Sequence, residues 1–134
     1  MTLDEQTSDQ VLAEAHLAGV DRAFLGVVDR WLEEPLRGCT RGAVREASFV
    51  LAELLSNAFR HARPPFAVRV ALPQLGGALR LEVHDGMASS TTGWPLGSGL
   101  RVVRALCPDW GIEHEPDGKA VWAELPILVS PADV

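Results

Sequence analysis

Residues 40–62 have the apolar spacing of a long amphipathic helix, and this stretch constrains the fold more than any other. At about 100° per residue, one face of that helix is wholly apolar and wide enough to be buried. The apolar face consists of Val44, Ala47, Leu51, Leu54, Ala58 and Ala62. Residues four apart are neighbours on a helix, so Glu53, Asn57 and His61 share a second face. The sequence therefore predicts a helix that packs on a core and carries a line of carboxylate, carboxamide and imidazole groups.

Two strand patterns follow this helix, which must end at Pro64-Pro65 because proline has no N–H to continue it. Apolar and polar residues alternate over residues 66–72 and again over 79–84, as in half-buried strands. Asp85 continues the apolar row of the second strand toward the interior. A buried carboxylate needs a partner, and the exocyclic amine of adenine is a suitable donor. The alternative is that Asp85-Gly86 forms a turn, as this dipeptide often does.

Weaker patterns complete the chain. Residues 11–17 fit a short edge strand, and a helix is equally arguable. The other expected elements are a helix from 20 to about 34, a mobile loop at 86–98, a helix at 100–107, a strand beginning at 110, a turn at 115–118 and a strand at 119–125. This order predicts an α/β (α+β) two-layer sandwich, with helices on one face of a mixed, mostly antiparallel sheet. We expect one domain at 10–126, between a disordered lead-in at 1–9 and a loose tail at 127–134.

Composition and charge exclude several functions. The chain has 134 residues and a net charge of −6 without a basic run, so nucleic acid is not an expected partner. Lys119 is its only lysine and lies in no glycine loop, which excludes a Walker-type NTPase. No apolar run approaches the roughly 20 residues that cross a bilayer, so we expect no membrane association. Cys39 and Cys107 are too few for a disulfide framework, which fits a reduced, cytoplasmic protein.

Three short motifs occur along the chain in a fixed order. Glu53 and Asn57 lie one turn apart on the central helix, Asp85 ends the second strand, and Gly97-Ser98-Gly99-Leu100 opens the next helix. An isolated Glu-Asn pair more often lies on the polar side of a surface helix. The complete order resembles the ATP-binding domain of the GHKL superfamily, which includes gyrase and histidine kinases. It is most similar to the small, free-standing branch of bacterial anti-sigma factor serine kinases, and the resemblance covers most of the chain.

This resemblance implies a fold of the two-layer type, Mg²⁺ and ATP as ligands, and a set of site residues. The residues implied at the nucleotide are Asn57, Asp85, Met87, Gly97, Ser98, Gly99 and Leu100. Arg60 and His61 lie near the same edge and are further candidates for contact with phosphate, although a structural role is equally arguable for His61. Asn57 would give its side-chain oxygen to Mg²⁺, and Glu53 would accept a proton from the water or serine hydroxyl that attacks the γ-phosphate. Asp85 would accept a hydrogen bond from adenine, with Met87 against the purine face. The glycine loop and the N–H groups of the following helix would receive phosphate.

The sequence departs from the GHKL pattern at three positions. Met87 and Ser89 stand where the second motif usually has glycines. Ala120 stands where a threonine commonly shares a water with the aspartate and adenine. The loop at 86–98 is short, and Trp94 is its only large apolar side chain, so we expect nucleotide or partner binding to order this loop around Trp94.

Two functional hypotheses follow from these observations. The first is a serine/threonine kinase that binds Mg-ATP and phosphorylates a small antagonist of an anti-sigma factor. The alternative is a non-catalytic module of the same fold that sequesters a sigma factor or another regulator, with weak or no ATP binding. A homodimer is a further expectation. The catalytic domain of a histidine kinase is disfavoured, since no helical dimer domain or membrane segment precedes the motifs.

Overall fold

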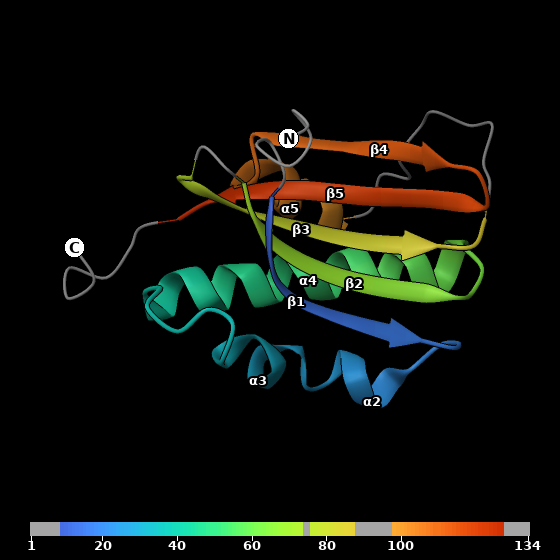
Figure 1. Ribbon diagram of the computed structural model, residues 1–134, viewed down its shortest axis with the longest axis horizontal. Coiled ribbons are helices and arrows are strands. Elements are labelled where there is room, and N and C mark those ends of the chain that lie inside the picture. Colours follow the sequence, from blue (N-terminus) through green and yellow to red (C-terminus); the bar gives the residue numbers. More distant parts are fainter. Residues whose placement is uncertain (1–8, 74–75, 88–97, 128–134) are drawn as a thin grey trace, which may run out of the picture.

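The protein folds into a sheet with all of its described helices on one face (Figure 1). This arrangement is seen in a computed structural model that describes residues 9–73, 76–87 and 98–127. The strands are β1 (Gln10–Leu17), β2 (Phe66–Leu72), β3 (Ala78–Asp85), β4 (Asp109–Glu115) and β5 (Gly118–Pro126). The helices are α2 (Arg22–Leu25), α3 (Val28–Glu33), α4 (Arg41–His61) and α5 (Ser98–Leu106).

The sheet has five strands in the order β1-β2-β3-β5-β4, and every pair among these described strands is antiparallel. The N-terminal segment is an edge strand rather than a helix, since β1 pairs with β2 from Gln10 to Leu17 with a register shift after Val11. The predicted two-layer α+β sandwich is thus confirmed. The pairing of β3 with β5 joins strands that α5 and β4 separate in the sequence.

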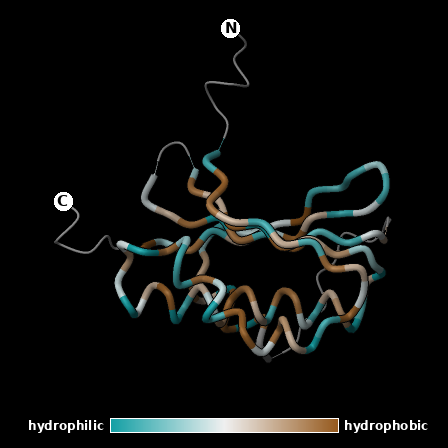
Figure 2. Tube along the Cα trace, turned by 60° about the horizontal axis from the view of Figure 1, so that its bottom comes forward, coloured by the Kyte–Doolittle hydropathy of each residue, from teal (hydrophilic) through white to brown (hydrophobic). Residues whose placement is uncertain are grey.

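The long helix α4 lies beneath the central strands and supplies much of the core (Figures 1 and 2). Its N-cap is Thr40, whose side chain accepts a hydrogen bond of 3.1 Å from the N–H of Ala43. Fully enclosed side chains come from both layers, because one face of each amphipathic element is apolar. They include Leu32, Leu36, Val50, Leu51, Leu55, Val68, Val70, Leu81, Val83, Val103 and Ala123.

The helix predicted from residue 20 to about 34 is two short helices instead. Asp21 caps α2 by accepting a hydrogen bond of 2.9 Å from the N–H of Phe24. The chain then turns at Gly26, whose N–H bonds back to the carbonyl of Arg22, before α3 begins at Val28. Glycine is a poor residue for a helix interior because it loses the most backbone entropy when fixed, so the break falls at this position.

Several expectations concern residues outside the described part of the chain. The lead-in at 1–8, most of the tail and the loop residues 88–97 lie there, and so do Ser89, Trp94 and Gly97. Within the described ranges, no helix is long and apolar enough to cross a membrane.

Candidate functional site

The candidate site lies at the edge of the sheet where β3 ends and β5 begins. Asp85 is the last residue of β3, and its side chain is only 1% exposed. Its backbone pairs directly with Lys119 of β5, while Val83 pairs with Val121 two residues earlier. Asp85 therefore continues the buried row of β3 toward the helices, as the alternation of the sequence predicts.

Asp85 has an internal ionic partner, Lys119. The Nζ atom of Lys119 lies 2.9 Å from Oδ2 of Asp85, and the lysine side chain is 15% exposed. The other carboxylate oxygen, Oδ1, accepts a hydrogen bond of 2.8 Å from the N–H of Met87. The turn expected at Asp85-Gly86 is therefore present, and the same buried carboxylate forms a charge-assisted bond with a lysine.

Two glycines hold the backbone around Asp85. A Cβ atom on Gly118 would lie 1.8 Å from the carbonyl oxygen of Asp85, a distance at which the backbone must shift. A Cβ atom on Gly86 would lie 2.4 Å from the carbonyl oxygen of Pro64. The N–H of Gly86 also donates a hydrogen bond of 2.7 Å to the carbonyl of Arg63. These contacts bring the end of β3 against the chain that follows α4 and leave no room for larger residues.

Glu53 and Asn57 lie on the flank of α4 that faces α5. Both side chains are half-buried. Glu46 lies seven residues before Glu53, and therefore on the same flank of the helix. Cys107 lies just after the end of α5. The pKa of its thiol is raised to about 11, mainly by burial and secondly by the negative charge of Glu46. The predicted carboxylate and carboxamide thus lie along the border between the two helices.

The start of α5 is directed toward the end of the sheet that carries Asp85. The helix ends just before β4, and Asp109 at the start of β4 pairs with Glu124, near the far end of β5. The charge of Glu46, near the start of α4, acts on Cys107, just after the end of α5, and the two helices contact each other, so α5 runs antiparallel to α4. The first turn of α5 therefore lies toward the half of α4 that carries Asn57. Leu100 in this turn is buried.

Arg60 and His61 occupy the last turn of α4, and both are exposed. The guanidinium of Arg60 and the protonatable imidazole of His61 complement the dipole at the C-terminus of α4. Both residues can therefore stabilise the helix without binding a ligand. They lie at the same end of the molecule as Asp85, because Arg63 contacts Gly86 just beyond β3. Their expected contacts with phosphate stay a prediction.

Lys119 was missed by sequence reasoning, which placed the residue beside the aspartate at Ala120. The register shows that Ala120 pairs with His84, so it belongs to the opposite face of the sheet, and Lys119 pairs with Asp85. The sequence offers one signal for this residue, since it is the only lysine in the chain. Its position opposite Asp85 depends on the pairing of β3 with β5, which local alternation does not reveal.

Protein side chains alone do not form a metal centre in the part of the chain described here. No cluster of three or more His, Cys, Asp or Glu residues in those ranges could hold a metal ion. Mg²⁺ commonly takes one or two protein oxygens and completes its octahedron with phosphates and water. The side-chain oxygen of Asn57 fits that requirement when a nucleotide brings the remaining oxygens.

A groove elsewhere on the molecule has a volume of ≈ 810 Å³. It lies between α3 and the first half of α4, and its walls include Val28, Leu36 and Arg41. None of the residues expected to bind nucleotide lines it. Its size alone therefore does not identify it as the nucleotide site.

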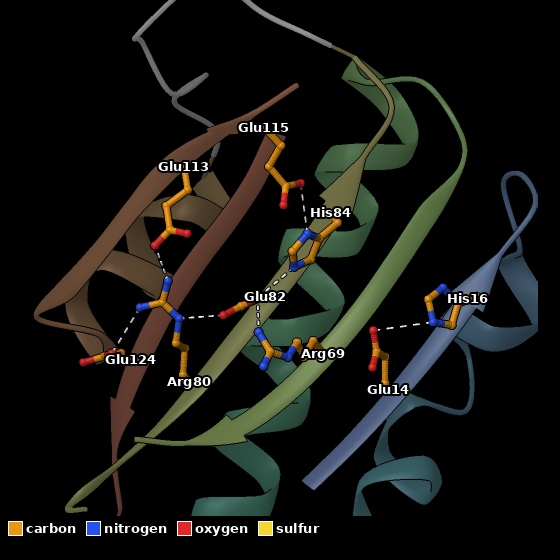
Figure 3. A network of polar contacts seen from close by, with 9 residues as sticks. All are labelled: Glu14, His16, Arg69, Arg80, Glu82, His84, Glu113, Glu115 and Glu124. Atoms are coloured by element: carbon orange, nitrogen blue, oxygen red, sulfur yellow. Dashed lines mark hydrogen bonds and ion pairs between the residues drawn. The ribbon is translucent and has the colours of Figure 1, made fainter. Parts of the chain in front are cut away.

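The open face of the sheet carries a second polar cluster, centred on Glu82 (Figure 3). Glu82 is buried, and its carboxylate lies 2.6 Å from Nε of Arg80, 2.7 Å from Nε2 of His84 and 3.5 Å from Arg69. Burial opposes ionisation of Glu82, but the bonds from His84 and Arg80 outweigh it and lower its pKa from 4.5 to about 2. The hydrogen bond to Glu82 in turn raises the pKa of His84.

This open-face cluster is a structural network that joins four strands, since Arg69 belongs to β2. Arg80 also contacts Glu113 of β4 at 2.6 Å and Glu124 of β5 at 3.4 Å. Its guanidinium lies over the ring of Trp122, 4.2 Å from the centroid. The network therefore ties β3 to its neighbours on the side away from the helices.

Comparison with solved structures shows a similar fold in a bacterial protein. The chain is similar to the crystal structure of the RsbU and RsbW domains of Rv1364c from Mycobacterium tuberculosis, with a TM-score of 0.60 and 20% sequence identity. The match covers 86% of this chain and 32% of that one, so the chain spans about a third of its length. No family model matches the chain, and no curated protein is similar to it in sequence. At this identity the likeness shows the fold alone, an α+β sandwich with an antiparallel sheet.

Proposed function

We propose that this chain is a bacterial regulatory protein of the anti-sigma factor kinase type, which binds Mg-ATP and phosphorylates a small antagonist protein. One observation carries the proposal. The buried carboxylate of Asp85 lies at the end of β3, where the end of α4 and the start of α5 are also directed. In a fold similar to the RsbU and RsbW domain structure, this arrangement of the end of β3, the end of α4 and the start of α5 supports a shared ligand site at one end of the molecule.

Each motif has a distinct task in the proposed reaction. Asp85 would accept a hydrogen bond from the base, and the first turn of α5 would receive phosphate at its free N–H groups. Asn57 would bind Mg²⁺, which neutralises charge on the phosphates. Glu53, one turn before Asn57, would take the proton of the attacking serine hydroxyl. The half-buried position of Glu53 and Asn57 beside α5 supports these roles.

The proposed partners are an antagonist protein as substrate and a sigma factor as the regulated protein. The likeness to the structure of the RsbU and RsbW domains supports a protein partner. Pairing of two copies of this chain stays a prediction.

Calorimetric titration with Mg-ATP tests the nucleotide site directly. The unmodified chain should bind, and Asp85→Asn should weaken binding while the far-UV circular dichroism stays unchanged. Asn57→Ala should remove the dependence of binding on Mg²⁺. Glu53→Ala should keep Mg-ATP binding but lose phosphate release from ATP to water, the simplest transfer that the same base would assist. Absence of nucleotide binding, or equal phosphate release in the Glu53 variant, would contradict the proposal.

A second candidate is the non-catalytic binding module of the same fold. The ion pair between Asp85 and Lys119 favours it, because the ammonium takes a position on the carboxylate that an adenine amine would otherwise use. Such a module would bind its protein partner equally well with and without Mg-ATP. A partner affinity that changes with nucleotide would decide for the kinase.

A further inference from the structure

The Asp85–Lys119 pair presents an acceptor and a donor side by side at the position where the proposed nucleotide would place its base. The two groups are 2.9 Å apart, and both face the helix side of the sheet from adjacent strands. We propose that Lys119 is a base-specificity residue, which allows the site to bind guanine nucleotides as well as adenine nucleotides. This inference rests on the proposed nucleotide-binding function and names its ligand class.

An aspartate alone would select adenine by repelling guanine. An ionised carboxylate only accepts hydrogen bonds. Adenine offers it an exocyclic amine, whereas guanine has a carbonyl oxygen at the same ring position. Two acceptors facing each other in a buried slot are unfavourable, and specificity often depends on such a repulsive contact.

Lys119 removes that repulsion by adding a donor. Its ammonium carries three N–H groups, of which the bond to Asp85 uses one. A remaining N–H can donate to the guanine carbonyl oxygen or to a ring nitrogen of adenine. Asp85 also retains acceptor capacity, since each of its oxygens has two lone pairs and, among the described residues, bonds to one partner, Met87 or Lys119. The pair can therefore complement both purines.

The base would meet the complete pair rather than the aspartate alone. A charge-assisted bond between an ammonium and a carboxylate is stronger than a bond from a neutral amine. Moving Lys119 away would leave the side chain of Asp85, which is 1% exposed, as a buried charge without its cation. The backbone cannot easily release the lysine either, because Gly118 packs directly against the carbonyl of Asp85.

Competition titrations with Mg-ATP and Mg-GTP test this role of Lys119. The unmodified chain should bind the two nucleotides with dissociation constants within about tenfold of each other. Lys119→Thr should weaken Mg-GTP at least about tenfold more than Mg-ATP, because it restores the unshielded carboxylate. The matched control is Arg104→Met, which removes a cation from the exposed side of α5 and should leave the ratio unchanged.

The outcomes separate this inference from the proposed function. Binding of Mg-ATP with more than about tenfold preference over Mg-GTP in the unmodified chain overturns the role of Lys119 and leaves the nucleotide site standing. Tighter Mg-ATP binding by Lys119→Thr also overturns the proposed role, since Lys119 would then obstruct the binding of adenine nucleotides. Absence of binding by both nucleotides refutes both proposals. If Lys119→Thr fails to fold, the ratio measured on the unmodified chain decides by itself.

Discussion

The buried carboxylate of Glu82 should make the stability of this protein fall at acid pH, and Glu82→Gln isolates that contribution. The substitution keeps the shape of the side chain and removes its charge. It leaves Arg80, which is 14% exposed, and His84 facing a neutral amide. Removal of one partner from a buried ionic cluster is costly because the remaining charges lose their compensation.

The magnitude follows from the pKa of Glu82. A pKa lowered from 4.5 in the unfolded chain to about 2 in the folded protein corresponds to about 3 kcal/mol of stability. The pKa is depressed on folding, so this contribution is complete well above pH 4.5 and is lost as the pH falls from 4.5 through 2. By pH 3, about 2 kcal/mol should already be lost. Glu82→Gln should therefore be destabilised by about 3 kcal/mol at pH 7 and by about 1 kcal/mol at pH 3.

Urea unfolding followed by circular dichroism at pH 7, 5 and 3 measures this difference. Glu113→Gln is the matched control, because Glu113 contacts the same Arg80 at 2.6 Å but its side chain is 61% exposed. An exposed ion pair contributes about 0–1 kcal/mol to stability, so Glu113→Gln should change the free energy of unfolding little at any of the three pH values. The reasoning fails if Glu82→Gln is destabilised equally at pH 7 and pH 3, since its charge would then contribute nothing to the folded state.

Three further changes test other parts of the structure. Gly118→Ala should lower the free energy of unfolding, measured by heat or urea, by more than about 3 kcal/mol, because its Cβ would collide with the carbonyl of Asp85. Gly19→Ala is the control and should be close to neutral, because no atom lies within 4 Å of the added Cβ. Thr40→Ala should cost about 1 kcal/mol through loss of the α4 cap, and an unchanged melting temperature would argue against that cap. His84→Gln should be less stable than the unmodified chain at pH 6. The difference in stability should shrink as the pH rises through the raised pKa of His84, and thermal unfolding measured from pH 6 to 9 would show this.

The elements with strong local signals were predictable from the sequence. The long helix follows from its apolar face, its Thr40 cap and the prolines that end it. The alternation of 66–72 and 79–84 was sufficient to place Asp85 on the buried side of β3. These features depend on residues close together in the chain, so period and propensity determine them.

Features that depend on distant pairing were not predictable in the same way. The ion pair of Asp85 with Lys119 requires β5 to lie beside β3, although β4 comes between them in the sequence. A shift of one residue in that register moves a side chain to the opposite face, and Ala120, which the GHKL pattern put at the place of a threonine near the aspartate, lies opposite His84. The break at Gly26 was missed for a different reason, since the apolar spacing of residues 20–34 fits one helix as well as two.

The strand β3 carries two buried carboxylates that point to opposite faces, and each one is compensated by cations from its surroundings. Glu82 faces the open side and is held by Arg80 and His84, whereas Asp85 faces the helices and is held by Lys119. The first set involves several groups and joins β3 to β4 and β5, so it resists loss of any single bond. The second is a single pair beside a proposed ligand site, where an incoming base would share its bonds. If the proposed base recognition by Lys119 holds, stability and ligand selection depend on different faces of one strand, and substitutions at Glu82 and Lys119 should affect them separately.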